Sequence, residues 1–376
     1  MRLAHFSDTH LGLHQYHYTL DGGRNVREQD IYDAFERAVD KIIELRPDAV
    51  VHAGDLFDGF HPSNAAIGVA FDQFKRLHAE RIPIVVIAGN HSTPRVAAKD
   101  HVFGLLDRLG CVHAVHAKPE VIEIGELAVT AIPHCNDPDQ LREWITQATP
   151  SSKHRFNVLV VHVGLNRLDS VGAKEAGHVS FSGETLEEVK EFTYIALGHL
   201  HKFGRSRINA YYAGSLERIT WADDAKHKGI LEVDLTADPF DDDSGYVTPH
   251  PIRSRRFERL PVIDASQTDN LTSAILAAAE DKRVKEAIVK LPIRDVTVDV
   301  FGAIDRRAIN RAFEDCLHLE LDPHFIDGTS AGGAQPGAPQ ELRDFLATRV
   351  PRGVEADKFI ARAEAYLTKA SEEIGA

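Results

Sequence analysis

The sequence is poor in cysteine and has no long apolar segment. Its 376 residues include only three cysteines, Cys111, Cys135 and Cys316, which lie far apart and without metal-type spacing. This odd, scattered set argues against a disulfide framework and favours a reducing, cytoplasmic compartment. No apolar run approaches the roughly 18 residues of a membrane span, and the first residues lack the pattern of a signal peptide. We therefore expect a cytoplasmic protein without a membrane partner.

Positive charge is also in short supply. The chain has 43 Lys and Arg against 57 Asp and Glu, which gives a formal net charge of -14. This balance argues mildly against broad, nonspecific binding of polyanions. It does not exclude nucleic acid, because carboxylates gathered around metal ions are neutralised locally. The length allows two or three domains. The 21 histidines are many for this length, and five of them lie in the motifs described next.

Five apolar segments of strand length each end in polar residues. They cover residues 2–6, 48–53, 83–88, 157–161 and 192–197. The motifs that follow them are, in order, Asp-x-His, Gly-Asp, Gly-Asn-His, His and Gly-His-x-His. Helical spacing of apolar residues separates the first three, which predicts a layered α/β domain with a largely buried sheet. Ligand sites in such sheets lie beyond the carboxyl ends of strands, where every one of these motifs falls.

The remainder of the chain predicts a second, smaller unit and a tail. From Arg253 the order is strand, helix, strand, a helix capped by Asp305, and strand, which fits a small α+β capping domain. Residues 328–338 have the composition of a flexible linker. Apolar residues spaced by three and four then predict a helical tail, which docks either on its own domain or on a partner. The predicted domains are 1–252, 253–327, 328–338 and 339–376.

The strand ends carry a set of side chains that suits divalent metal ions. The set is Asp8, His10, Asp55, Asn90, His91, His162, His199 and His201. Carboxylate, imidazole and amide oxygen favour manganese, iron or zinc. The donors are too many for one tetrahedral ion, so two ions bridged by a carboxylate are the economical interpretation. Two ions roughly 3.5–4 Å apart can activate a nucleophile and hold the oxygens of a phosphate. Any one motif alone would more often be a turn or a core histidine.

These motifs, in this order, resemble the calcineurin-like metallophosphoesterase superfamily over roughly residues 1–235. The ligands that the resemblance implies are Asp8, His10 and His201 for one ion and Asn90, His162 and His199 for the other. Asp55 would bridge the two ions, and His91 would protonate the leaving oxygen or stabilise charge on the phosphate. The family commonly has Asp after Gly-Asn-His, whereas this chain has Ser92. That departure leaves open how His91 or its turn is held.

Finer features resemble the SbcD-type nuclease branch, the nuclease subunit of the SbcCD repair complex. They are Phe-Ser-Asp-Thr-His-Leu-Gly near the start, Gly-Asp-Leu-Phe-Asp followed by Pro-Ser, Tyr-Ala-Gly-Ser-Leu-Glu-Arg at 212–218, and Lys228-Gly229. The resemblance implies a nuclease with two divalent ions, manganese foremost, with magnesium, iron or zinc as alternatives. Such a nuclease acts in double-strand break repair as an exonuclease on duplex ends and an endonuclease on single strands or hairpins. It also implies a homodimer and an SMC-like ATPase bound through the C-terminal helices.

Several assignments stay open at this point. His17 and His61 could contact DNA or could be solvated loop residues. Arg253, Arg255, Arg256 and Arg259 could touch phosphate, although alternation along a strand would split them between two faces. A cyclic-nucleotide or other small phosphodiester hydrolase would carry the same core. A scaffold with lost catalysis is the alternative from a different class, and an intact ligand set argues against it.

Overall fold

The computed structural model describes residues 1–16, 18–20, 23–93, 101–165, 180–181, 189–223 and 227–326. Contacts divide it into two compact units. The first comprises Met1–Glu258 with Lys285–Ile288, and the second comprises Arg259–Val284 with the described residues from Val289 onward. The domain boundaries derived from the sequence stay predictions. His17, the predicted linker (328–338) and the predicted tail (339–376) lie outside the described residues.

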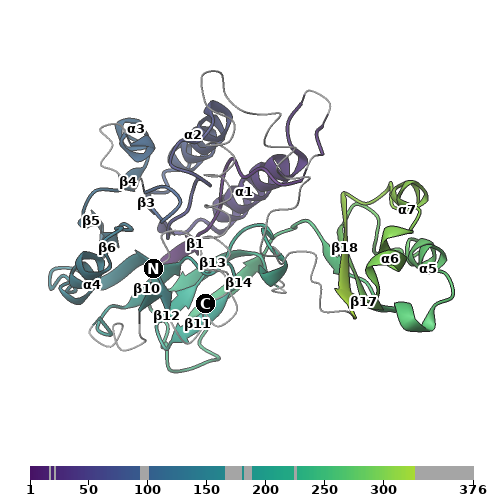
Figure 1. Cartoon of the computed structure of the whole chain (residues 1–376). Coiled ribbons are helices and arrows are strands. Elements are labelled where there is room, and N and C mark those ends of the chain that lie inside the picture. Colours follow the sequence, from purple (N-terminus) through teal and green to yellow (C-terminus); the bar gives the residue numbers. More distant parts are fainter. Residues whose placement is uncertain are drawn as a thin grey trace, which may run out of the picture. The chain divides into compact units, whose positions relative to one another are not determined.

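Two six-stranded sheets form the first unit (Figure 1). The first sheet has the order β14-β13-β1-β2-β3-β4, in which β1 to β4 run parallel, β13 is antiparallel to β1, and β14 is antiparallel to β13. Its strands are β1 (Arg2–Phe6), β2 (Ala49–His52), β3 (Ile84–Ile87), β4 (His113–Val115), β13 (Gly229–Asp234) and β14 (Val247–Pro251). The predicted apolar strands β1, β2 and β3 are therefore neighbours, and their carboxyl ends share one edge.

The second sheet has the order β11-β12-β10-β7-β6-β5. Its strands are β5 (Glu120–Ile124), β6 (Leu127–Ile132), β7 (Phe156–His162), β10 (Tyr194–Gly198), β11 (Gly204–Arg207) and β12 (Ala210–Tyr212). Strands β6, β7, β10 and β12 are parallel, so the ends of β7 and β10 also lie at one edge. A short pair, β8 (Gly164–Leu165) with β9 (Ser180–Phe181), follows β7.

Helix boundaries in the first unit follow local sequence signals. The helices are α1 (Val26–Leu45), α2 (Asn64–Ala79), α3 (Val102–Arg108), α4 (Pro138–Thr146) and the short 3-10 turn η2 (Trp221–Asp223). Ser63 caps α2, because its side chain accepts a hydrogen bond from the Ala66 N–H. Helix α1 ends where Arg46 adopts a left-handed conformation (φ 50°), one residue before Pro47.

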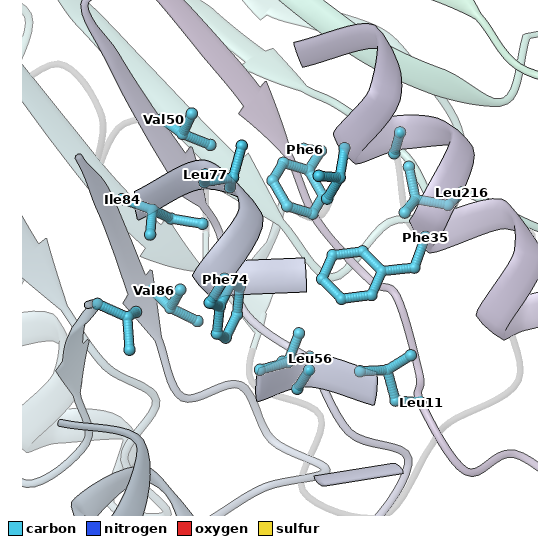
Figure 2. Packing of buried hydrophobic residues seen from close by; sticks show 14 of the residues in the cluster. Phe6, Leu11, Phe35, Val50, Leu56, Phe74, Leu77, Ile84, Val86 and Leu216 are labelled. Carbon is cyan, nitrogen blue, oxygen red and sulfur yellow. The ribbon is translucent and has the colours of Figure 1, made fainter. Parts of the chain in front are cut away.

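Alternation along each strand builds three separate cores. Phe6 and Val50 pack against α1 and α2 through Phe35, Phe74 and Leu77 (Figure 2). The intervening side chains point the other way, and the second core, between the two sheets, contains Leu3, Val51, Val85, Val129, Val158 and Ala196. A third core lies on the outer face of the second sheet and includes Leu141 and Ile145 of α4. The predicted layered α/β domain is confirmed, and its layers are two facing sheets flanked by helices.

The second unit is a small α+β structure. Its elements are β16 (Ile263–Asp264), η3 (Ala265–Gln267), α5 (Leu271–Ala278), β17 (Ile288–Val296), α6 (Val298–Gly302), α7 (Arg306–Ala312) and β18 (His318–Phe325). Strand β17 pairs with β16 and β18. Asp305 caps α7, as predicted, by accepting from the N–H groups of Arg307 and Ala308. The first strand expected after Arg253 is two strands, β15 (Phe257–Arg259) and β16, because Pro261 cannot donate to a ladder.

Among the described residues, no helix combines the length and the apolar character that crossing a membrane requires.

Candidate metal centre

The five polar motifs meet where the carboxyl ends of the two sheets face each other. Asp8 and His10 follow β1, Asp55 follows β2, and Asn90 and His91 follow β3, while the second sheet supplies His162, His199 and His201 at the ends of β7 and β10. Hydrogen bonds join the two sets. Nδ1 of His162 lies 2.8 Å from the Ala53 carbonyl oxygen, and the His199 N–H donates to Asp8 Oδ1 at 3.0 Å. The layered fold therefore assembles the centre from both sheets.

One group of possible ligands comprises Asp8, His10 and His201. Their donor atoms all lie within 4.8 Å of one another, and Asp8 and His10 are each 1% exposed. Nε2 of His10 and Nε2 of His201 are only 3.1 Å apart. Two imidazole nitrogens at this distance can share one proton or can both donate lone pairs to a cation. This group therefore fits a divalent ion.

A second group centres on His162 and Asn90. Because the Ala53 carbonyl can only accept, Nδ1 of His162 carries a hydrogen and the lone pair of the neutral ring is on Nε2. That Nε2 lies 2.8 Å from Asn90 Oδ1 and 3.1 Å from Asp55 Oδ2. Nδ1 of His199 is 3.2 Å from the same Asn90 oxygen. Lone pairs thus converge here as well, which is the arrangement that a cation requires.

Asp55 lies between the two groups. It belongs to a cluster with His10 and His91 and to another with Asp8 and His162. Burial by itself would raise the pKa of Asp55, but the adjacent His162 outweighs this effect and lowers that pKa well below its usual value. Burial would lower the pKa of His162, whereas Asp55 raises it to about 9. The pairing therefore favours the ionised form of Asp55, which is the form that binds a cation.

The backbone around these ligands is held in an uncommon conformation. Asp8, His10 and Asp55 have φ values of 52°, 53° and 53°, and His199 has 97°. Few non-glycine residues adopt positive φ, and such strain clusters at functional sites. Close approach also fixes the composition of one turn, because a Cβ at Gly89 would overlap the Asp55 carboxylate. The Gly in Gly-Asn-His is therefore a requirement of the site.

His91 lies beside the two groups and is held by Asp58. Its Nδ1 is 2.9 Å from the Asp58 carbonyl oxygen, its N–H donates to Asp55 Oδ1 at 3.0 Å, and its side chain is 25% exposed. The Asp58 carboxylate contacts Nδ1 of His10 at 3.2 Å, which orients that ring. The sequence prediction did not include Asp58, although its position three residues after Asp55 in Gly-Asp-Leu-Phe-Asp was the available signal.

Ser92 stands where the resembling family commonly has Asp. The next residue, Thr93, closes the Gly-Asn-His turn instead. The Thr93 hydroxyl donates to the Gly89 carbonyl at 2.8 Å across Gly-Asn-His. Ser92 is fully buried, and within the described part of the chain its hydroxyl has no hydrogen-bond partner. The conformation of His91 is thus maintained by Thr93 and by Asp58, without an acid at position 92.

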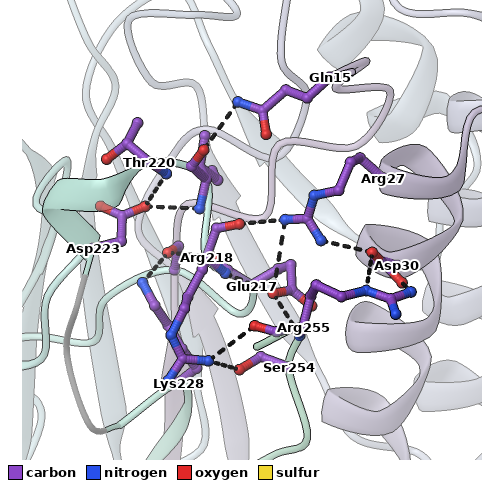
Figure 3. Close-up of polar contacts among 12 residues, drawn as sticks. Gln15, Arg27, Asp30, Glu217, Arg218, Thr220, Asp223, Lys228, Ser254 and Arg255 are labelled. Atoms are coloured by element: carbon purple, nitrogen blue, oxygen red, sulfur yellow. Dashed lines mark hydrogen bonds and ion pairs between the residues drawn. The ribbon is translucent and has the colours of Figure 1, made fainter. Parts of the chain in front are cut away.

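The remaining predicted residues lie apart from these groups. His61 is exposed, contacts Phe60 with ring centroids 4.3 Å apart and the rings tilted by 48°, and is in none of the metal-binding groups found among the described residues. Arg255, expected as a possible phosphate contact, belongs to a partly buried cluster that we call the arginine network. Its members are Arg27, Asp30, Glu217, Arg218, Ser254 and Arg255 (Figure 3).

Comparisons with known proteins agree with this geometry. The calcineurin-like phosphoesterase family model matches residues 1–203. Among curated relatives, the DNA double-strand break repair protein Mre11 of Methanocaldococcus jannaschii is 31% identical over 252 residues, 64% of each chain. Its counterpart in Sulfurisphaera tokodaii is 31% identical over 206 residues, 53% of this chain and 49% of the relative. These matches thus span about half to two thirds of the relatives' length.

A longer match is found in the protein of the same description from Thermoplasma acidophilum. It is 30% identical over 316 residues, which cover 81% of this chain and 78% of the relative. The family model covers more than half of the 376 residues and includes the motifs from Asp8 to His201. We conclude that the chain belongs to the calcineurin-like phosphoesterase family.

Proposed function

We propose that this chain is a two-metal nuclease that hydrolyses DNA phosphodiesters in double-strand break repair. The observation that carries the proposal is the position of Asp55 between two converging groups of ligands, with His91 beside them. Asp8, His10 and His201 would hold one ion, Asn90, His162 and His199 would hold the other, and Asp55 would bridge. DNA as the substrate is supported by the similarity to Mre11 proteins.

The residues themselves account for binding and proton transfer. Two divalent ions, when bound, supply charge neutralisation at the phosphate and a more acidic water. Because Nδ1 of His91 donates to the Asp58 carbonyl, only Nε2 of that ring can gain and release a proton. A protonated His91 would therefore donate from Nε2 to the leaving oxygen. The contact of Asp58 with His10 would keep one ligand and the acid in a fixed relation.

The proposal extends to the cofactor, the partners and the compartment. Manganese is the proposed ion, because mixed carboxylate, imidazole and amide ligands suit it. Exonuclease action on duplex ends and endonuclease action on single strands or hairpins are proposed, as are DNA contacts by His17 and His61. Residues 339–376 would bind an SMC-like ATPase, and two copies would form a homodimer in the cytoplasm. These assignments rest on the family resemblance and on the low cysteine content.

A direct test uses the purified chain with Mn²⁺ and then Mg²⁺. Linear duplex DNA, a DNA hairpin and a small chromogenic phosphodiester are offered in parallel to the wild type, His91→Ala and His78→Ala. His78 is an exposed histidine of α2 and serves as the matched control. We expect Mn²⁺-dependent DNA cleavage that His91→Ala lowers by about 10²–10⁴-fold while metal binding persists. His78→Ala should cleave like the wild type.

Other outcomes would change the assignment. Cleavage of the small ester with intact DNA, even after addition of a partner captured with residues 339–376, would indicate the small-phosphodiester alternative. Bound metal without turnover of any substrate would indicate a scaffold. Equal loss of activity in His91→Ala and His78→Ala would remove the proposed role of His91.

A further inference from the structure

The segment from Gly214 to Asp223, which we call the support loop, lies directly behind His201. The Ser215 N–H donates to the His201 carbonyl at 3.3 Å, and the buried Lys228 ammonium donates to the same carbonyl at 2.7 Å and to the Ser215 hydroxyl at 2.6 Å. Gly214 has a φ of 77°, and a Cβ there would lie 2.8 Å from the Phe203 nitrogen. The main chain at His201 is therefore fixed by a loop that only glycine allows to approach.

The side chain of His201 is contacted by the other end of the support loop. Oδ2 of Asp223 lies 3.3 Å from Nδ1 of His201. The same oxygen accepts from the N–H groups of Ile219 at 2.8 Å and Thr220 at 3.0 Å (Figure 3). Asp223 is only 4% exposed. Backbone N–H groups can only donate hydrogen bonds, so these two fix the orientation of the Asp223 carboxylate. Its Oδ2 then faces the imidazole of His201 as an acceptor.

The contact determines which nitrogen of His201 is available to a ligand. A ring that donates its Nδ1–H to a carboxylate keeps its lone pair on Nε2. Nε2 of His201 is the atom that lies 3.1 Å from Nε2 of His10, and it belongs to the group that includes Asp8. Carboxylates in this relation to ligating histidines fix the tautomer and the ring orientation.

We propose that Asp223 is a positioning residue that holds His201 with Nε2 directed at the ion shared with Asp8 and His10. The inference rests on the two-metal centre proposed above. It also gives a role to the sequence between Tyr212 and Arg218, which the resemblance identified without explaining. The support loop would hold His201 by its main chain through Ser215 and by its side chain through Asp223.

The competing explanation is that Asp223 only stabilises its own turn, since two of the three hydrogen-bond donors that the described residues supply to it are backbone N–H groups of that turn. The chain offers a control for this case. The Thr220 hydroxyl accepts from the Ala222 N–H at 3.2 Å within the same turn. Thr220→Ala therefore removes a hydrogen bond of the turn and leaves the contact between Asp223 and His201 in place.

The experiment measures Mn²⁺ binding by the full chain. Calorimetry gives the affinity of each site, and electron paramagnetic resonance distinguishes a spin-coupled pair of ions from an isolated Mn²⁺. We expect Asp223→Ala to weaken one of two sites by about 10–100-fold, with an isolated six-line spectrum replacing that of the coupled pair. Asp223→Asn keeps an acceptor oxygen and should lie between Asp223→Ala and the wild type. Thr220→Ala should bind both ions as the wild type does.

The outcomes separate the inference from the function on which it rests. Wild-type protein that binds two ions, together with an Asp223→Ala variant that binds them equally well, would overturn the role of Asp223 alone. Equal weakening by Asp223→Ala and Thr220→Ala would also overturn it and would assign the effect to the turn. Wild-type protein that binds no Mn²⁺ would overturn the two-metal centre and this inference together. If Asp223→Ala does not fold, Asp223→Asn, which retains the acceptor for the turn, decides the question.

Discussion

The candidate metal centre and the arginine network are both clusters of charge with buried members, yet their carboxylates are paired with different cations. In the network, Asp30 meets the guanidinium groups of Arg27, at 2.6 Å, and Arg255. In the metal centre, Asp55 meets the imidazoles of His162 and His10, at 3.1 and 4.0 Å. A guanidinium remains protonated, whereas an imidazole can release its proton. A buried carboxylate paired with histidines can therefore exchange a proton for a metal ion, and one paired with arginines cannot.

The strongest test of this comparison is Asp55→Asn. It removes the charge that both ligand groups share, so we expect loss of at least one ion and a fall in hydrolysis of more than about 10³-fold, since one electrostatic group alone is worth about 10²–10³-fold. Saturating Mn²⁺ should raise the unfolding temperature of the wild type by ligand linkage and should raise that of the variant much less. An undiminished Mn²⁺-induced shift in the variant would contradict the bridging role.

Gly89→Ala should damage the centre without removing a ligand. The added Cβ would overlap the Asp55 carboxylate, so either the Gly-Asn-His turn or Asp55 must move. We expect metal affinity to fall by about 10–100-fold, the usual cost of displacing the support of a ligand. Gly68→Ala is the control, because its Cβ would meet nothing within 4 Å in α2. That change should leave Mn²⁺ binding intact and stabilise the helix by roughly 0.5–1 kcal/mol.

Arg27→Met should lower stability and leave metal binding intact, which is the opposite of what we expect for Asp55→Asn and Gly89→Ala. Arg27 is fully buried and lies 2.6 Å from Asp30 and 3.8 Å from Glu217. Removal of one partner of a buried ion pair costs about 3–5 kcal/mol, so urea unfolding should show a loss of this size. The increase in unfolding temperature on addition of Mn²⁺ should remain that of the wild type. A variant that keeps its stability and loses metal would show that the two clusters are not separate.

The smallest expected effect concerns the pH dependence of the arginine network. Burial raises the pKa of Glu217, and Arg27 only partly opposes this effect. The folded protein therefore binds more protons than the unfolded chain above the ordinary pKa of 4.5, and stability is lost as the pH rises through the folded pKa. Glu217→Gln cannot titrate.

Urea unfolding of Glu217→Gln and of the wild type in EDTA, from pH 4.5 upward, measures the contribution of Glu217 to the pH dependence of stability. We expect the difference in unfolding free energy to shift in favour of the variant as the pH rises. A constant difference across the range, or a shift in favour of the wild type, would mean that Arg27 outweighs the cost of burial.

The sequence analysis anticipated the metal centre better than its surroundings. The eight side chains that the strand-end motifs predicted do lie close together, since parallel strands share one edge and a local pattern is enough to place them. Their roles as ligands and acid stay predictions. The sequence analysis missed Asp58 and Asp223. Asp58 had a local signal in its spacing from Asp55. Asp223 had none, because it lies 22 residues after His201 and contacts it only through the path of the support loop.

The arginine network is a second case in which a local sequence pattern did not predict the partners of a side chain. From the sequence, Arg255 belonged to a basic cluster that could touch phosphate. In the fold, its side chain is paired with Asp30, which is 225 residues away, and its N–H donates to Glu217. No local pattern encodes such a pairing, because the partners come from different elements and meet only through the packing of the first unit.

Local chemistry in the sequence thus determined the strands, the helix caps and the identity of the possible metal ligands. Each of these depends on residues within a few positions of one another, through apolar periodicity, capping side chains and the turn that follows a strand. Tertiary structure alone decided which carboxylates face imidazoles and which face arginines. That choice depends on how two sheets and the support loop pack, and it separates a centre that can accept metal from a partly buried cluster of ion pairs.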